Sequence, residues 1–200
     1  MQNVLYELDG KLYVNLTNQC PCRCTFCIRL NGKGVGTADN LWLASEPSFA
    51  QVRELLIEAD LERYDEVVFC GYGEPFCALD VMLDTMRYLR EATDLRIRIN
   101  TNGLGDLIQK KKTAVLLAGL CDTISISLNA ADADSYQNAC RPEFGLRSFD
   151  AMLNFASDCV GIVPKVVFTV VDVLSQDEIG KCREIARSRG VDFRIRSFIA

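Results

Sequence analysis

The segment from Lys11 to Cys27 reads KLYVNLTNQCPCRCTFC, an apolar run followed at once by four cysteines. The run predicts a short β-strand over Lys11–Thr17. Within the cysteine group, Cys20, Cys24 and Cys27 are spaced C-x3-C-x2-C. Thiolates hold iron–sulfur clusters, and a four-iron cube normally takes four of them. Three thiolates would leave one iron with an open position for chemistry.

Further along the chain, short β-branched runs alternate with longer stretches of helical period. The predicted strands are Lys11–Thr17, Glu66–Cys70, Leu95–Thr101, Thr123–Leu128, Lys165–Val171 and Asp192–Phe198. The predicted helices are Leu79–Glu91, Asp106–Ala118, Ser148–Cys159 and two that begin at the capping boxes Ser48/Gln51 and Ser175/Glu178. This alternation is typical of an α/β fold with parallel strands.

Six strands fall short of the eight in a closed barrel. We therefore expect a partial, open (β/α)6 TIM-type barrel with parallel strands, with a flat doubly wound sheet as the alternative. The 200 residues are enough for one well-cored domain over 1–200 and too few for two typical ones.

Composition excludes several function classes. The 27 acidic against 22 basic residues give a net charge of −5, which disfavours a nucleic-acid partner. No apolar stretch is long enough to span a bilayer and the first residues do not form a secretory signal, so we expect a cytoplasmic protein with no membrane partner. In a reducing cytosol the 10 cysteines indicate metal ligands and buried thiols. The absence of histidine excludes Ser–His and Cys–His nucleophile pairs.

Polar residues and glycines follow the ends of several predicted strands. GYGEP (71–75) follows the second strand, Asn102 the third, and Ser127 and Asn129 close the fourth. Sites in parallel α/β folds form at the carboxyl ends of strands. The arrangement therefore predicts an enzyme site on one rim of the sheet.

The cysteine spacing and these strand ends resemble the radical S-adenosylmethionine (SAM) enzymes. The resemblance implies that Cys20, Cys24 and Cys27 bind a [4Fe–4S] cluster whose open iron chelates SAM. It also implies that Phe26 lies near the SAM adenine. Cys22 fits no triple with this spacing and is predicted to be a bystander, so Cys22→Ala should keep the cluster and Cys24→Ala should lose it. A structural zinc knuckle at Cys24–Cys27 is the alternative, and it lacks a second ligand pair.

The same resemblance assigns the SAM contacts. Tyr72, Gly73 and Glu74 would bind the SAM amino group, since glycine permits close approach and a carboxylate suits an ammonium. The remaining assignments are Asn102, Ser127 and Asn129 around the ribose and carboxylate, and Arg141 to the carboxylate. Asn-Gly is equally a generic turn, and an arginine before proline is usually solvated.

The implied reaction is reductive cleavage of SAM to a 5′-deoxyadenosyl radical that abstracts hydrogen from an unknown substrate. It requires an external electron donor of the flavodoxin or ferredoxin type. Leu5–Leu8, LYVNLTNQCPCRCTFCIR (12–29) and VVFTVVDVLS (166–175) resemble the small radical SAM proteins associated with TatD-family hydrolases, which implies a functional link to such a hydrolase. The alternatives are an activase that acts on a partner protein's glycine and a non-catalytic iron–sulfur electron-transfer module. Trp42, the single tryptophan, is predicted to pack in the core.

Overall fold

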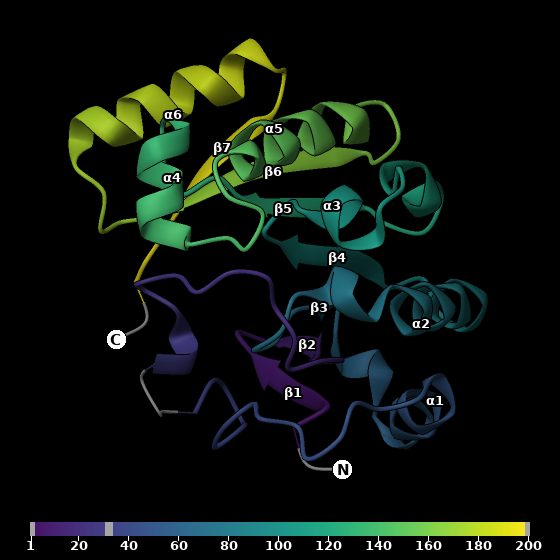
Figure 1. Cartoon of the computed structure of the whole chain (residues 1–200). Helices are drawn as coiled ribbons and strands as arrows, with labels where there is room; N and C mark the ends of the chain where they lie inside the picture. The colour runs from purple at the N-terminus through teal and green to yellow at the C-terminus, as the bar shows by residue number, and fades with distance from the viewer. Residues whose placement is uncertain (1–2, 31–33, 199–200) are drawn as a thin grey trace.

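The computed structural model describes residues 3–30 and 34–198, which form one seven-stranded sheet. The strands follow in chain order across the sheet, and every neighbouring pair is parallel except the first. They are β1 (Leu5–Leu8), β2 (Lys11–Val14), β3 (Glu66–Phe69), β4 (Arg96–Thr101), β5 (Thr123–Ser127), β6 (Lys165–Val171) and β7 (Asp192–Arg196). The sheet curves into an open, partial TIM-type barrel, which confirms the predicted fold class (Figure 1).

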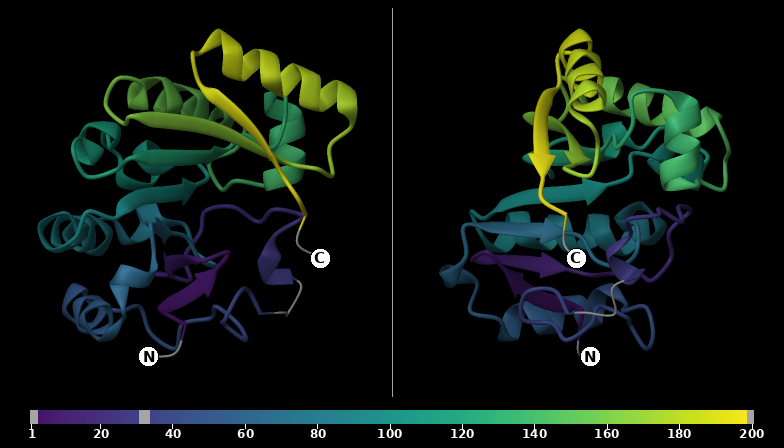
Figure 2. Two further views of the ribbon diagram at one scale, coloured as in Figure 1. Left: turned by 180° about the vertical axis from the view of Figure 1, so that it is seen from behind. Right: turned by 90° about the vertical axis from the view of Figure 1, so that its left-hand side faces the viewer.

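Helices connect the strands and wrap the outer side of the curved sheet (Figures 1 and 2). The α-helices are α1 (Phe49–Glu58), α2 (Leu79–Ala92), α3 (Gly105–Gln109), α4 (Ala133–Cys140), α5 (Arg147–Cys159) and α6 (Gln176–Ser188). The 3-10 turns are η1 (Ile28–Leu30), η2 (Leu61–Arg63), η3 (Pro75–Ala78) and η4 (Ala114–Leu117). Both predicted capping boxes form, at Ser48 and Ser175. None of the described helices is long and apolar enough to cross a membrane.

β1 is a strand that the sequence pattern did not predict. It pairs antiparallel with β2 across a tight turn formed by Asp9 (φ 51°) and Gly10 (φ 71°). Two consecutive residues with positive φ are typical of the type I′ hairpin turn, for which Asp-Gly is a favoured sequence. The added strand pairs with the edge of β2, so the sheet has seven strands where six were predicted.

The helix predicted over Asp106–Ala118 is wrong in extent. α3 ends at Gln109 because Lys110 adopts a left-handed conformation with φ 53°. The Asp106 carboxylate then accepts the N–H and the hydroxyl of Thr113, both at 2.8 Å. Such a local side-chain bond competes with helix continuation, and the chain resumes as the separate turn η4.

The two faces of the sheet differ in composition because alternate strand residues point to opposite sides. The face covered by helices is apolar, and Ile99, Ile126 and Phe168 are fully buried there. We call the other side the open face. Its side chains in β2–β7 include Tyr13, Glu66, Val68, Arg98, Asn100, Ser125, Ser127, Thr169, Arg194 and Arg196. Over β1–β3 the open face is covered by Val35, Ala38 and Leu41.

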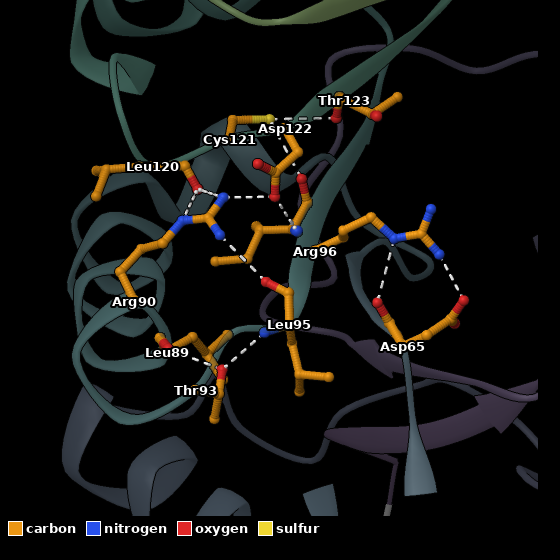
Figure 3. Close-up of polar contacts among 11 residues, drawn as sticks. Asp65, Leu89, Arg90, Thr93, Leu95, Arg96, Leu120, Cys121, Asp122 and Thr123 are labelled. Atoms are coloured by element: carbon orange, nitrogen blue, oxygen red, sulfur yellow. Dashed lines mark hydrogen bonds and ion pairs between the residues drawn. The ribbon is translucent and has the colours of Figure 1, made fainter. Parts of the chain in front are cut away.

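Polar contacts tie α2 to the amino ends of β4 and β5 (Figure 3). Arg90 of α2 donates to the carbonyl oxygens of Leu95 at 3.1 Å and Leu120 at 3.0 Å, and pairs with Asp122 at 2.5 Å. The same Asp122 carboxylate accepts the Ile97 N–H at 2.6 Å. These bonds stabilise the amino end of the sheet. The opposite end carries residues 19–27, which we call the cysteine segment.

Candidate active site

Backbone hydrogen bonds fix the cysteine segment, which follows the carboxyl end of β2, to the end of α4. The N–H groups of Arg23 and Thr25 donate to the carbonyl oxygens of Cys140 (3.0 Å) and Ala139 (2.9 Å). The last carbonyl groups of a helix have no partner within the helix, and here the cysteine segment supplies the missing donors. α4, a helix that the sequence pattern did not predict, therefore sets the position of the cysteines.

The three predicted cluster cysteines, Cys20, Cys24 and Cys27, are half-buried. A hydrogen bond with the Cys22 thiol lowers the pKa of Cys20. Hydrogen bonds with the Cys140 and Cys22 thiols lower the pKa of Cys24. Burial raises the pKa of Cys27. Because the thiolate is the form that binds metal, two of the three positions already favour the ligating form.

Cys22 does not lie apart from the cluster cysteines. Its side chain is buried, and its thiol is hydrogen-bonded to the thiols of Cys20 and Cys24. These hydrogen bonds raise the pKa of Cys22 far above the usual value of a thiol. That Cys22 does not itself bind the cluster stays a prediction. Two of the scattered cysteines, Cys159 and Cys182, are fully buried in the apolar core as expected for small apolar residues.

The donor set fits an iron–sulfur cube better than a single metal ion. Within the described ranges, no three His, Cys, Asp or Glu side chains converge closely enough to hold one metal ion. A zinc ion would draw its sulfur ligands to about 2.3 Å from one centre. A cube bonds each cysteine to a different iron, so its ligands stand further apart. The pKa values of Cys20 and Cys24 are also lowered, which favours the thiolate form that such a cluster takes as ligand.

Arg29 is a site residue that sequence analysis missed. Its positive charge acts to lower the pKa of all three predicted cluster cysteines. Its Nε donates a hydrogen bond to the carbonyl oxygen of Tyr72, and its guanidinium lies 5.5 Å from the centre of the Trp42 ring. No motif marks this arginine, because its partner on the GYGEP segment is distant in the sequence. A fixed cation at this position would stabilise a negatively charged thiolate site.

The core position predicted for Trp42 is wrong. Its side chain is 49% exposed, and its ring packs edge-on against Tyr72 at 5.1 Å between ring centres. Tyr72 takes the inner position, with 4% exposure. The tryptophan thus forms an outer layer over the GYGEP segment and beside Arg29.

Gly73 is required by packing between strand ends. A Cβ atom at this position would lie 2.1 Å from the carbonyl oxygen of Thr17, in the segment that follows β2. No side chain fits there, and only glycine permits the approach. The N–H of Glu74 then donates to the Gln19 carbonyl oxygen at 2.8 Å. The GYGEP segment is therefore attached directly to the start of the cysteine segment.

Glu74 is a buried carboxyl group, 3% exposed, at the junction of three strand ends. Its Oε1 accepts the Thr101 hydroxyl at 2.6 Å, and its Oε2 accepts the Asn102 N–H at 2.8 Å. Burial, with a smaller contribution from Cys20, raises the pKa of Glu74 to about 8. A cation placed beside it would favour the ionised form again. This position is suited to an ammonium group.

Two predicted amides lie at neighbouring strand ends, one beside the cysteine segment and the other beside the end of α4. The Asn102 Nδ2 lies 3.9 Å from the Cys20 sulfur and 3.7 Å from the Cys22 sulfur. The Asn129 Nδ2 lies 3.9 Å from the Cys140 sulfur. Asn129 is 5% exposed, and its Oδ1 has no hydrogen-bond partner among the described residues. A buried acceptor without a donor is costly, so this oxygen is available to a ligand.

The other predicted site residues are less tightly grouped. The Ser127 hydroxyl accepts a hydrogen bond from Arg196 Nη2 at 3.4 Å on the open face. Phe26 is half-buried and packs against the apolar core. Arg141 ends α4 in a left-handed conformation (φ 46°) with an exposed side chain. In the described part of the chain, no hydrogen bond or ion pair joins Arg141 to another predicted site residue.

Known proteins share both the sequence pattern and the fold. The sequence model of the radical SAM superfamily matches residues 14–184. GTP 3',8-cyclase of Corynebacterium glutamicum is 30% identical over 194 residues, which cover 92% of this chain and 47% of that protein. A probable dual-specificity RNA methyltransferase RlmN of Staphylococcus aureus is 31% identical over 111 residues, which cover 52% of this chain and 30% of that protein. The chain thus spans half or less of these curated relatives.

The fold agrees with solved structures. The crystal structure of Streptococcus suis SuiB bound to S-adenosylmethionine superposes with a TM-score of 0.70 at 17% identity, covering 96% of this chain and 40% of that one. The chain therefore has the open α/β barrel of these structures, with its cysteine segment after the carboxyl end of β2. The chain belongs to the radical SAM superfamily. Members of this superfamily use a [4Fe–4S] cluster together with SAM.

Proposed function

We propose that Cys20, Cys24 and Cys27 hold the [4Fe–4S] cluster of this enzyme. The observation that carries the proposal is the position of these thiols on a segment that α4 fixes in place and that Glu74 joins to the neighbouring strand ends. Arg29 supplies a neighbouring positive charge, and Asn102 places an amide beside Cys20. When bound, the cluster would supply the electron for reductive cleavage of SAM to methionine and a 5′-deoxyadenosyl radical, and that radical would take a hydrogen atom from the substrate.

The strand ends would hold SAM. Glu74 offers a buried carboxyl group to the amino group, and the neighbouring Tyr72 and Gly73 offer backbone. Arg141 suits a carboxylate because its guanidinium presents several donors in one plane. The polar groups proposed for the ribose and carboxylate are Asn102, Ser127 and Asn129, and Phe26 is proposed for the adenine.

The partners follow from this chemistry. The reaction needs an external electron donor of the flavodoxin or ferredoxin type. All 10 cysteines are free thiols, which supports a reducing, cytoplasmic location. The resemblance of Leu5–Leu8 and the cysteine segment to the TatD-associated branch supports a functional link to a TatD-family hydrolase. The substrate proposal is developed below.

A matched pair of cysteine variants tests the cluster assignment. The wild type, Cys24→Ala and Cys22→Ala are reconstituted anaerobically with iron and sulfide, and the iron content and visible absorption are measured. We expect Cys24→Ala to lose the cluster and Cys22→Ala to keep it. Both sulfurs lie in the same network of thiols, so the pair separates ligation from proximity. Loss of the cluster from Cys22→Ala but not from Cys24→Ala would overturn the assignment.

SAM cleavage is then measured on the loaded wild type. After reduction with dithionite, 5′-deoxyadenosine is quantified in the absence of any substrate. Product from the loaded, reduced protein supports the proposed chemistry. A fully loaded and reducible cluster that yields no 5′-deoxyadenosine from SAM would contradict it.

A further inference from the structure

The open face carries two arginines at the carboxyl end of β7. Arg194 lies opposite Thr169 of β6 and Arg196 lies opposite Val171, so both side chains share the open face. Arg196 reaches across β6, where its Nη2 donates to the Ser127 hydroxyl of β5 at 3.4 Å. Because β2 to β7 are parallel, β7 ends at the same edge of the sheet as the cysteine segment (Figure 1). The two arginines are thus on the rim that holds the proposed cluster site.

The charges of the open face are not balanced along the strands. At its amino end, Arg98 pairs with Glu66 at 3.0 Å and Lys165 pairs with Asp192 at 3.9 Å. At its carboxyl end, neither Arg194 nor Arg196 forms an ion pair with any described residue. Asp172, the acid that follows β6, accepts the Phe198 N–H at 2.8 Å. The carboxyl end of the open face therefore has an excess of positive charge.

Several polar atoms around these arginines are buried without a partner. Within the described ranges they are Nε of Arg196, Nε of Arg98 and Oδ1 of Asn100. Leaving a buried donor unpaired costs about 1–3 kcal/mol, more for a charged group. Burial, together with the charge of Arg98 and Arg196, lowers the pKa of Arg194, and burial lowers the pKa of Arg196. An anion at this position would compensate both the unpaired donor and the mutual repulsion of the guanidinium groups.

We propose that Arg196, assisted by Arg194, binds an anionic group of the substrate, either a carboxylate or a phosphate. Both groups match the planar donor fork of a guanidinium. The charge of Arg196 is close enough to Cys24 and Cys70 for mutual electrostatic effects, so a ligand held here lies beside the proposed cluster. The inference rests on the proposed function, because it takes the open face as the substrate side of a radical SAM enzyme. It adds the charge class of the substrate.

Anion binding to the SAM-saturated, cluster-loaded enzyme tests the proposal. Inorganic phosphate and succinate are titrated separately into wild type, Arg196→Gln and Arg194→Gln by calorimetry. Arg187→Gln is the control, since that side chain is 82% exposed on α6. We expect saturable binding of at least one probe to the wild type and the control, at least tenfold weaker binding to Arg196→Gln, and a smaller loss in Arg194→Gln. The tighter probe identifies the anionic group.

Three results would overturn the proposal. They are no saturable binding of either probe to the wild type, equal binding to Arg196→Gln, or a tenfold loss of SAM affinity in Arg196→Gln with unchanged probe binding. The last result would assign the guanidinium to the SAM carboxylate. Arg196→Lys, which keeps the charge, is titrated in parallel and decides the question if Arg196→Gln does not fold. Iron content and 5′-deoxyadenosine from the wild type are recorded on the same samples, so a failure of the radical SAM assignment is seen separately.

Discussion

The two faces of the sheet are made of alternating residues of the same strands, and they have opposite characters. On the helix-covered face, Ile99 and Phe168 are fully buried among apolar side chains. Their immediate neighbours on the open face, Asn100 and Thr169, are polar, and the Asn100 Oδ1 has no partner among the described residues. The amino end of the open face is neutralised by ion pairs, whereas Arg196 at its carboxyl end forms none with the residues that the structure describes.

This difference separates stability from chemistry within single strands. Apolar burial on the helix-covered face contributes the free energy of folding, since each fully buried aliphatic or aromatic side chain is worth about 1.5–3 kcal/mol. Unpaired polar groups on the open face reduce that stability and supply the donors and acceptors that a ligand needs. We therefore expect substitutions on the two faces to change different measurements.

The largest expected effect is at Phe168 on the helix-covered face. Phe168→Ala should lower the free energy of unfolding by about 3–5 kcal/mol, because it leaves a cavity beneath the helices. Ser125→Ala, at a 4% exposed position on the open face of the neighbouring strand, is the matched control and should cost about 1 kcal/mol or less. Urea unfolding of the cluster-free chain measures both. Equal losses would mean that the open face contributes to stability as much as the helix-covered face.

A smaller effect is expected from Glu74, where the strand ends meet the site. Burial raises its pKa to about 8 from the usual 4.5, so between these values the folded chain holds a proton that the unfolded chain releases. The stability of the cluster-free chain should therefore fall as pH rises through this window. Glu74→Gln removes this titration, and the variant should gain about 2 kcal/mol over wild type between pH 5.5 and 7.

Urea unfolding at several pH values measures the Glu74 effect, with the exposed Glu91→Gln as control. A constant difference between Glu74→Gln and wild type at all pH values would show that the carboxyl group is already ionised in the folded chain. Calorimetry gives a second readout, since SAM binding to wild type should release a proton between pH 6 and 7.5. That proton release should be absent from Glu74→Gln.

Local sequence patterns predicted the strands and the longer helices. They did not predict where a helix ends when a single side chain ends it, or a helix as short as α4. All six predicted strands exist, although β2 ends at Val14 and β7 at Arg196, where Thr17 and Phe198 were predicted. The helix over Asp106–Ala118 was overpredicted, since helical period does not reveal that the Asp106 carboxylate bonds back to Thr113. α4, with only eight residues, is too short for periodicity to detect.

The site was predictable only where its residues are close in the sequence. The spacing of Cys20, Cys24 and Cys27 and the GYGEP segment are contiguous motifs, and the structure joins them through the bond from Glu74 to Gln19. Arg29 and Arg196 carry no such pattern. Their importance depends on the groups that surround them after folding. For Arg29 these are the thiols, and for Arg196 they are the buried polar atoms of the open face that have no partner among the described residues.

The smallest expected effect is at the N-termini of α1 and α6, which belong to the helix-covered face of the sheet. The Ser175 hydroxyl accepts the Glu178 N–H at 3.3 Å, and Ser175→Ala should lower the free energy of unfolding by about 1 kcal/mol without changing iron content. Hydrogen bonds with Ser175 lower the pKa of Glu178 in the folded chain. The ionised Glu178 therefore stabilises the start of α6 above the usual pKa of a glutamate, and this stabilisation is lost as pH falls below it. The cost of Ser175→Ala should therefore shrink in acid. Ser48→Ala, whose capping partner Gln51 is uncharged, should show no such change, and parallel behaviour of the two variants in acid would contradict the role of the carboxylate.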